Sequence, residues 1–251
     1  RVQWPHLGAS PYPCESVIPS SALIITSQHT GYVQHIDVQA LGAIAKADEI
    51  QIFMDVLPGS FVHVGMPLAR TVSLNNARGE ELTSSNEKII ATLAMGVRRT
   101  FEHDPRFGLS VLSEIASRAL SPAVNDPGTA IDVIGRGVRS LTCWGTPKEP
   151  TAKTDADCQH VYLRGLTVDD LFDDFFAPIA RDGAGLVEVD LRMMKALVSL
   201  AQINPAMFRG ACTLHAERLL KHANTALVLE EDRQKLSAAA RPLLHDSLLL
   251  R

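Results

Sequence analysis

The sequence predicts an α+β fold, in which a small β-rich module is followed by a mainly α-helical domain. Three observations predict this fold. Short runs of β-branched residues alternate with Gly and Pro turns over residues 22–75. Beyond residue 84, apolar residues recur at helical spacing. Asp104, Asp126 and Asn204 each stand directly before a proline and such a segment, which is typical of a helix start because the polar side chain caps the first turn.

Length and composition set outer limits on what the chain can be. Its 251 residues suffice for one large or two ordinary domains, and 46% of them are apolar. The net charge is −4, and Arg98-Arg99 is the one adjacent pair of Lys or Arg residues. Since phosphate contacts need clustered Lys and Arg, we expect no nucleic acid partner. No apolar run approaches the roughly 18 residues that cross a bilayer, and the chain begins at Arg1 without a signal peptide, so we expect it to be a piece of something longer.

The four cysteines, Cys14, Cys143, Cys158 and Cys212, are widely spaced and include no C-x-x-C pair. This density argues against a disulfide framework and predicts reduced, buried thiols. One alternative stays open, because Cys143 and Cys158 flank a predicted loop and would pair in an oxidising compartment.

The β-rich module spans residues 22–75 and follows an extended, proline-rich lead-in over residues 1–21. Its elements are predicted from β-branched runs, from helical spacing and from alternation of apolar and polar residues. In order, they are strands over 22–26 and 32–38, a helix over 38–47, a strand over 49–56 and an extended run over 61–68.

Two glycine-containing segments, Gly31-Tyr32-Val33 and residues 59–68, resemble the two halves of a barrel-sandwich hybrid, the fold of biotinyl and lipoyl carrier modules. Glycines permit the tight turns of such a module. The carriers hold their modified lysine in a tight hairpin, whereas here the connection is a predicted helix with Lys46 at its end. We therefore expect a structural β module without a prosthetic group, and no cofactor.

Residues 84–143 are predicted to form a central segment of three helices. The first helix starts at a capping box with Ser84 as the cap, and its apolar stripe runs to Val97. The other two helices follow the two Asp-Pro pairs. Gly135 and Gly137 lower the stability of the third helix, which predicts close packing against a neighbour.

A stretch rich in Pro, Lys and Asp predicts a linker loop over residues 144–158. The C-terminal part, residues 159–251, is predicted to be mainly helical after one strand at 161–166. Thr167 and Asn204 are the predicted caps of its first and third helices, and the tail adds a fourth helix.

The most concentrated polar residues stand around the two Asp-Pro pairs, and they form the candidate ligand-binding set: Arg99, His103, Asp104, Ser121, Asn125, Asp126 and Thr129. Helix capping accounts for both aspartates. For the proline-braced loop from Ser121 to Asp126, a rigid joint between helices or subunits is the plainer interpretation. Alternatively, this loop would hold an anion at the positive end of a helix. As a further alternative, Asn125 and Asp126 would offer oxygens to a divalent metal. If the helices after the two pairs are antiparallel, Asp104 and Asp126 lie about 20 Å apart, which argues against one metal site using both.

The sequence predicts no catalytic residue. It contains no G-x-S-x-G, no G-x-G-x-x-G and no P-loop. His215 and His222 stand seven residues apart on one predicted helix, which is too far for a single metal ion. Nothing in the motifs therefore indicates a reaction.

Two groups of residues carry a family resemblance. The central group comprises Arg99-Thr100 with Asp104, Phe107-Gly108-Leu109, and ALSPAVNDPGTA over residues 119–130; the upstream group comprises Gly31 to Asp37 and residues 59–68. Together they resemble the signature of a bacterial family of predicted integral membrane proteins that is classed as a domain of unknown function.

The resemblance implies that the chain is the soluble C-terminal part of a membrane protein, on the cytoplasmic side of the bacterial inner membrane. It assigns no reaction. We therefore expect a non-enzymatic, homo-oligomeric domain that acts in assembly, ligand sensing or gating of the membrane part. The alternative is a metal- or anion-dependent enzyme with its site around the Ser121–Asp126 loop.

Overall fold

The computed structural model describes residues 9–13, 18–75, 80–146 and 158–244, and for residues 80–84 it describes the backbone alone. The chain forms two compact units. The first unit comprises Arg1–Phe107 and Glu149–Leu166, and the second comprises Gly108–Lys148 and Thr167–Arg251. Strands gather in the first unit and helices in the second, so the predicted α+β class is confirmed.

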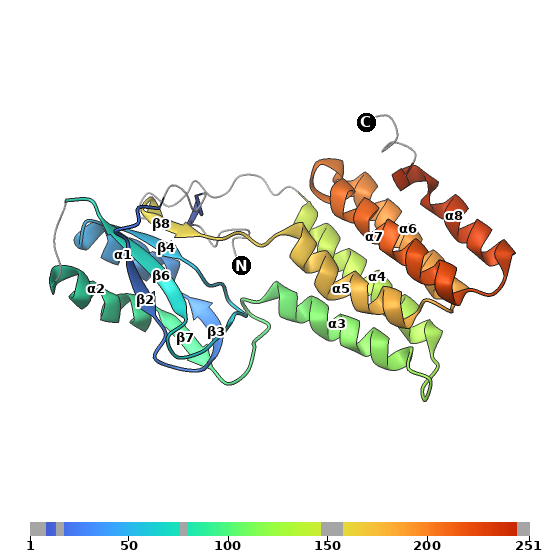
Figure 1. Ribbon diagram of the computed structural model, residues 1–251, viewed down its shortest axis with the longest axis horizontal. Helices are drawn as coiled ribbons and strands as arrows, with labels where there is room; N and C mark the ends of the chain where they lie inside the picture. The colour runs from blue at the N-terminus through green and yellow to red at the C-terminus, as the bar shows by residue number, and fades with distance from the viewer. Residues whose placement is uncertain (1–8, 14–17, 76–79, 147–157, 245–251) are drawn as a thin grey trace. The chain divides into compact units, whose positions relative to one another are not determined.

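The first unit contains two sheets (Figure 1). The larger sheet has the order β1-β8-β4-β6-β2, with β1 at Ser10–Pro11, β2 at Leu23–Thr26, β4 at Ile50–Met54, β6 at Pro67–Ser73 and β8 at Val161–Leu163. The smaller sheet has the order β5-β3-β7, with β3 at Gly31–Ile36, β5 at Phe61–Val62 and β7 at Leu93–Gly96. Strand β8 runs parallel to both β1 and β4, whereas the other pairs are antiparallel. The likeness to a barrel-sandwich hybrid stays a prediction.

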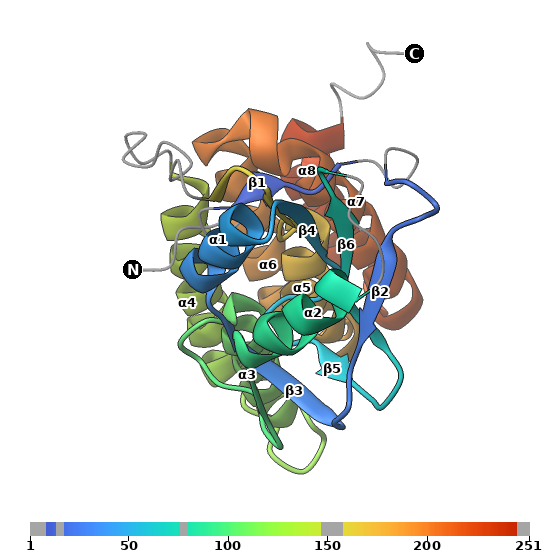
Figure 2. The ribbon, with the colours of Figure 1, turned by 90° about the vertical axis from the view of Figure 1, so that its left-hand side faces the viewer.

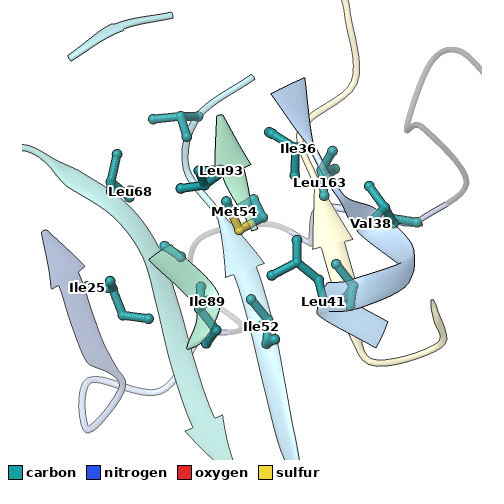
Figure 3. Packing of buried hydrophobic residues seen from close by; sticks show 14 of the residues in the cluster. Ile25, Ile36, Val38, Leu41, Ile52, Met54, Leu68, Ile89, Leu93 and Leu163 are labelled. Atoms are coloured by element: carbon teal, nitrogen blue, oxygen red, sulfur yellow. The ribbon is translucent and has the colours of Figure 1, made fainter. Parts of the chain in front are cut away.

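Two helices complete the first unit and lie next to each other (Figure 2). Helix α1, Val38–Ala47, has the predicted bounds, and it starts where the Asp37 carboxylate accepts a hydrogen bond of 2.9 Å from the N–H of Ala40. Helix α2 spans Glu80–Ala91. The strands and both helices contribute to one apolar core, in which Leu41, Ile52 and Ile89 are fully buried (Figure 3).

The predicted helix from Ser84 to Val97 is wrong at both ends. Helix α2 already begins at Glu80, so Ser84 lies inside it and is not its cap. The helix ends at Ala91, and Leu93–Gly96 becomes β7, which pairs with β3. Leu93 is buried in the core of this unit. The backbone hydrogen bonds to β3 and this burial outweigh the local helical pattern, because tertiary contacts override intrinsic propensity.

The units also divide the chain differently from the predicted ranges. The 159–166 segment, predicted as part of the C-terminal region, belongs to the first unit because β8 lies between β1 and β4 in the larger sheet. Part of the predicted lead-in, Ser10–Pro11, forms β1. The predicted linker overlaps the end of α4, which continues to Gly145, and residues 147–157 lie outside the described part.

The second unit is built from helices (Figure 1). They are α3 at Pro105–Ala119, of which residues from 108 belong to this unit, α4 at Pro127–Gly145, α5 at Val168–Asp182, α6 at Val187–Ile203, α7 at Pro205–Ala226 and α8 at Glu230–Leu244. Helix α6 packs against α4, α7 and α8. Two predicted caps are confirmed, since Thr167 accepts from the N–H of Asp170 at 3.1 Å and Asn204 from that of Met207 at 3.1 Å.

None of the three cysteines in the described part of the chain forms a disulfide. Cys143 is exposed, and Cys158 and Cys212 are buried. The prediction of buried thiols is therefore confirmed for two of these three residues, and Cys143 and Cys158 form no disulfide. Cys14 lies outside the described part of the chain.

Gly135 and Gly137 of α4 are expected to respond oppositely to alanine. A Cβ at Gly137 would overlap the ring of Phe175, a fully buried side chain of α5. A Cβ at Gly135 would meet only the end of the Arg192 side chain, 3.1 Å away, and that side chain can move. Gly135→Ala should therefore raise the free energy of unfolding by up to about 1 kcal/mol. Gly137→Ala should lower it by about 1–3 kcal/mol.

Urea unfolding followed by the fluorescence of Trp144, which lies at the end of the same helix, measures both effects when the other tryptophan, Trp4, is replaced by Phe in every protein compared. Equal responses of the two variants would contradict the predicted contact between Gly137 and Phe175.

Candidate functional site

The candidate residues form two groups, one in each unit. Arg99, His103 and Asp104 belong to the first unit. The residues of the Ser121–Asp126 loop and Thr129 belong to the second.

Asp104 is the centre of the first group. Its carboxylate is bound in a bidentate manner by Arg99, with Nε 2.6 Å from Oδ2 and Nη2 3.0 Å from Oδ1. Oδ1 also accepts the N–H of Phe107 at 3.0 Å, which confirms the predicted cap of α3. The Asp104 side chain is only 3% exposed. Bidentate, charge-assisted hydrogen bonds of this kind are the strongest that side chains form, so the carboxylate is fully engaged in the structure.

The turn at Gly59 packs directly on this carboxylate. Gly59 has a φ of +93°, which favours glycine, and a Cβ there would overlap the Asp104 carboxylate. The Gly59 N–H donates to the carbonyl oxygen of Val33 at 2.7 Å. The glycine therefore lets the β4–β5 turn close over the ion pair.

His103 lies beside a histidine that the sequence did not single out. The rings of His103 and His35 of β3 have centroids 4.4 Å apart. The Arg99 guanidinium lies 5.1 Å from the centre of the Phe107 ring. A pair of histidines alone is a poor metal site, and within the described ranges no group of three or more His, Cys, Asp or Glu residues could hold a metal ion.

Asp126 is the centre of the second group. Its Oδ1 accepts the N–H of Thr129 at 3.0 Å and its Oδ2 accepts the Thr129 hydroxyl at 2.6 Å. The hydroxyl of Thr129, followed by its backbone N–H, lowers the pKa of Asp126. The predicted cap of α4 is thus confirmed, and Thr129 takes part in it. Because a carboxylate already occupies the positive end of α4, a second anion there would be repelled.

The rest of the loop is closed on itself. The carbonyl oxygen of Ser121 accepts the N–H groups of Val124 and Asn125 at 3.0 and 2.9 Å, and the Asp126 N–H donates to Ala119 at 2.8 Å. The Ser121 hydroxyl donates to the carbonyl oxygen of Arg118 at 2.7 Å. Asn125 has a φ of 48°, a left-handed conformation that Asn tolerates. These contacts are those of a rigid connection between α3 and α4.

Sequence reasoning missed a polar network in the first unit. The Asp55 carboxylate accepts the hydroxyl of Tyr12 at 2.6 Å and Nε of Arg70 at 3.1 Å, and Nη2 of Arg164 lies 4.0 Å from it. Burial, followed by the hydrogen bond to Asp55, raises the pKa of Tyr12 to about 12, so the phenol keeps its proton.

Parallel pairing explains why these residues meet. Tyr12, Asp55 and Arg164 each directly follow one of the strands β1, β4 and β8, whose carboxyl ends share one edge of the sheet. The phenol of Tyr12, the carboxylate of Asp55 and the guanidinium of Arg164 connect the three strand ends, and Arg70 of β6 adds a second guanidinium to the carboxylate. The predicted strands over 49–56 and 161–166 enclosed Asp55 and Arg164, so these residues were not recognised as standing at strand ends, and strand β1 was not recognised either.

Comparisons with known proteins agree with the family resemblance. A family model described as "Predicted membrane protein (DUF2254)" matches residues 7–199. Uncharacterized proteins of Mycobacterium bovis and Mycobacterium tuberculosis are 34% identical over 116 residues, which make up 46% of this chain and 22% of each relative. The match thus spans less than a quarter of these curated relatives. No solved structure matches. Among the described residues, no helix has the length and apolarity needed to cross a membrane.

Proposed function

Because this chain belongs to the DUF2254 family of predicted membrane proteins, we propose that it is a non-enzymatic domain that serves the membrane part of such a protein. Its role would be in assembly, ligand sensing or gating. We place it on the cytoplasmic side of the inner membrane of a bacterium, as the family resemblance implies and as fits the bacterial relatives.

One observation carries the proposal: both candidate aspartates are already used by the fold. Asp104 is occupied by Arg99 and by the first turn of α3. Asp126 is occupied by Thr129. A catalytic acid, base or metal ligand must be able to release such contacts, whereas these contacts hold helix starts and interhelical connections in place. The arrangement therefore supports a mechanical role.

The assembly role predicts that the purified chain forms a homo-oligomer of defined size. Size-exclusion chromatography with light scattering should give one mass, a whole multiple of 27.2 kDa, that persists on dilution. A strict monomer at high concentration would overturn this part of the proposal.

The enzyme alternative, with a site at the Ser121–Asp126 loop, is tested separately. A thermal-shift screen with Mg²⁺, Mn²⁺ and inorganic phosphate should leave the melting temperature unchanged, because both oxygens of Asp126 have partners. A shift that Asp126→Ala abolishes, accompanied by turnover of a phosphoester, would instead establish the alternative.

A further inference from the structure

Seven large apolar side chains in the described part of the first unit are exposed, and four of them lie in or after strands β5 and β7. Phe61 is 54% exposed, Val64 64%, Val97 86% and Phe101 64%. Single exposed apolar residues are normal on protein surfaces, whereas a group of them marks an interaction site. Whether these residues mark an interaction site therefore depends on whether they lie close together.

The strand register places Phe61, Val64 and Val97 at one end of the smaller sheet, and Phe101 follows Val97 by four residues. Central strand β3 pairs Gly31 with Val62 of β5 and Tyr32 with Gly96 of β7. Val97 directly follows β7 and Val64 follows β5 by two residues, so both segments leave the sheet where β3 begins. Phe61 packs edge-on against Tyr32 in the same row, with ring centroids 5.1 Å apart. We call Phe61, Val64, Val97 and Phe101 the apolar tip.

Backbone contacts hold these segments in place. The turn that contains Val64 is tied to β2, since the N–H of Gly65 donates to the carbonyl oxygen of Ser27 at 2.8 Å. The segment after β7 is tied to β3, since the Gln34 side chain donates to the carbonyl oxygen of Arg98 at 2.7 Å. The ring of Phe101 stacks on that of Phe107 at 4.6 Å. The tip is thus a built surface, with its apolar groups ordered toward solvent.

We propose that the apolar tip inserts into the lipid–water interface of a bilayer. Aromatic rings favour the headgroup level and aliphatic side chains the boundary of the acyl region. Two findings favour a bilayer as the partner of this surface. The family is described as predicted membrane proteins, and most of the length of the mycobacterial relatives lies outside the part that matches this chain. The inference rests on the proposed function, since membrane segments elsewhere in such a protein would hold this unit beside the bilayer.

Charge adds little to this contact. Exposed Arg98 lies between Val97 and Phe101, and exposed Glu102 offsets it. Attraction to anionic lipid requires several uncompensated Lys or Arg residues. We therefore expect the tip to bind zwitterionic and anionic vesicles similarly and with little dependence on salt.

The test is co-sedimentation of the chain with phosphatidylcholine vesicles, with and without phosphatidylglycerol. The chain should sediment with both kinds of vesicle. The double variant Val97→Ser with Phe101→Ser should bind roughly tenfold more weakly, because it lacks methyl and ring carbons that would be buried in the bilayer. Val97→Ser alone keeps the Phe101 stacking and should be intermediate. The matched control is Val228→Ser with Leu229→Ser, residues 88% and 60% exposed between α7 and α8, which should bind like the unchanged chain.

Absence of sedimentation, or equal binding by the tip variant, would overturn the inference. If the chain does not sediment and the tip variant lowers the mass measured by light scattering, the tip is a contact between copies, which overturns the lipid contact and leaves the assembly role standing. A monomeric chain that sediments through its tip would instead contradict the assembly role and support the lipid contact.

Discussion

Replacing Asp104 by alanine is expected to lower the free energy of unfolding of the first unit by about 3–5 kcal/mol. The reason is that the positive charge of Arg99 loses its partner. Arg99 is 23% exposed in its side chain, and its guanidinium gives two hydrogen bonds to Asp104. Without the carboxylate it remains largely buried and unpaired. The first turn of α3 also loses the acceptor for the Phe107 N–H.

Near-ultraviolet circular dichroism in urea measures this loss. All three tyrosines belong to the first unit, so their signal follows the unfolding of that unit. The double variant Asp104→Ala with Arg99→Met should recover part of the stability, since the unpaired charge is then gone. A double variant as unstable as the sum of its parts would show that the ion pair has no coupling.

Asp126→Ala is the matched control from the same chain. It removes the other Asp-Pro cap, whose carboxylate is exposed and pairs with Thr129. Its loss leaves no charge buried, so the decrease in stability should be clearly smaller than for Asp104→Ala. A larger decrease would mean that the Ser121–Asp126 loop carries more of the fold than its contacts indicate.

The contrast between the two aspartates also shows what sequence could predict. A cap is a contact over three residues, so the spacing in the sequence contains most of the information it needs. Asp104, Asp126, Thr167 and Asn204 are confirmed as caps, whereas Ser84, predicted from similar spacing, lies inside α2. The ion pair between Asp104 and Arg99 has no such signature, because no helix or strand in the sequence pattern fixes how their side chains face each other. The candidate set therefore stays a prediction as a ligand site, and the sequence pattern gave no account of the burial of Asp104.

The features that the sequence did not predict depend on contacts between distant parts of the chain. Leu93–Gly96 has helical spacing and becomes a strand because β3, some 60 residues earlier, offers it a partner. Asp55 meets Tyr12 and Arg164 because strands β1, β4 and β8 run parallel. Strand β1 has only two residues, which is too short for a recognisable sequence pattern. The periodicity of apolar residues indicates the local preference for helix or strand, whereas these strand pairings depend on contacts between residues that are far apart in the sequence.

Replacing Asp190 by asparagine is expected to change how the stability of the second unit depends on pH. Asp190, in the first turn of α6, is 1% exposed, and its Oδ2 has no hydrogen-bond partner in the described part of the chain. Burial, followed by the charge of Glu188, raises the pKa of Asp190 from 3.8 to about 7. The folded unit therefore binds a proton that the unfolded chain has released, and stability falls as pH rises from about 4 to about 7. At 1.4 kcal/mol for each pH unit, the loss amounts to roughly 4 kcal/mol.

His215 acts in the opposite direction over nearly the same range. Burial lowers the pKa of His215 from 6.5 to about 4, so its neutral form is favoured by folding and stability rises with pH between these values. In the unchanged chain the two effects largely cancel. The pKa values of Asp126 and Asp182 are lowered from 3.8, so their contributions are lost only at lower pH.

Asp190→Asn should therefore expose the effect of His215. Between pH 4 and pH 6.5 the stability of the variant should rise by a few kcal/mol, whereas that of the unchanged chain stays nearly flat. Urea unfolding followed by Trp144 fluorescence at several pH values, with Trp4→Phe in all proteins, measures this in the second unit, where Trp144 packs near Phe208. The companion variant His215→Gln should show the reverse slope, with stability falling as pH rises. Parallel pH profiles for all three proteins would show that Asp190 keeps its charge in the folded unit, and a partner would then have to be sought for it.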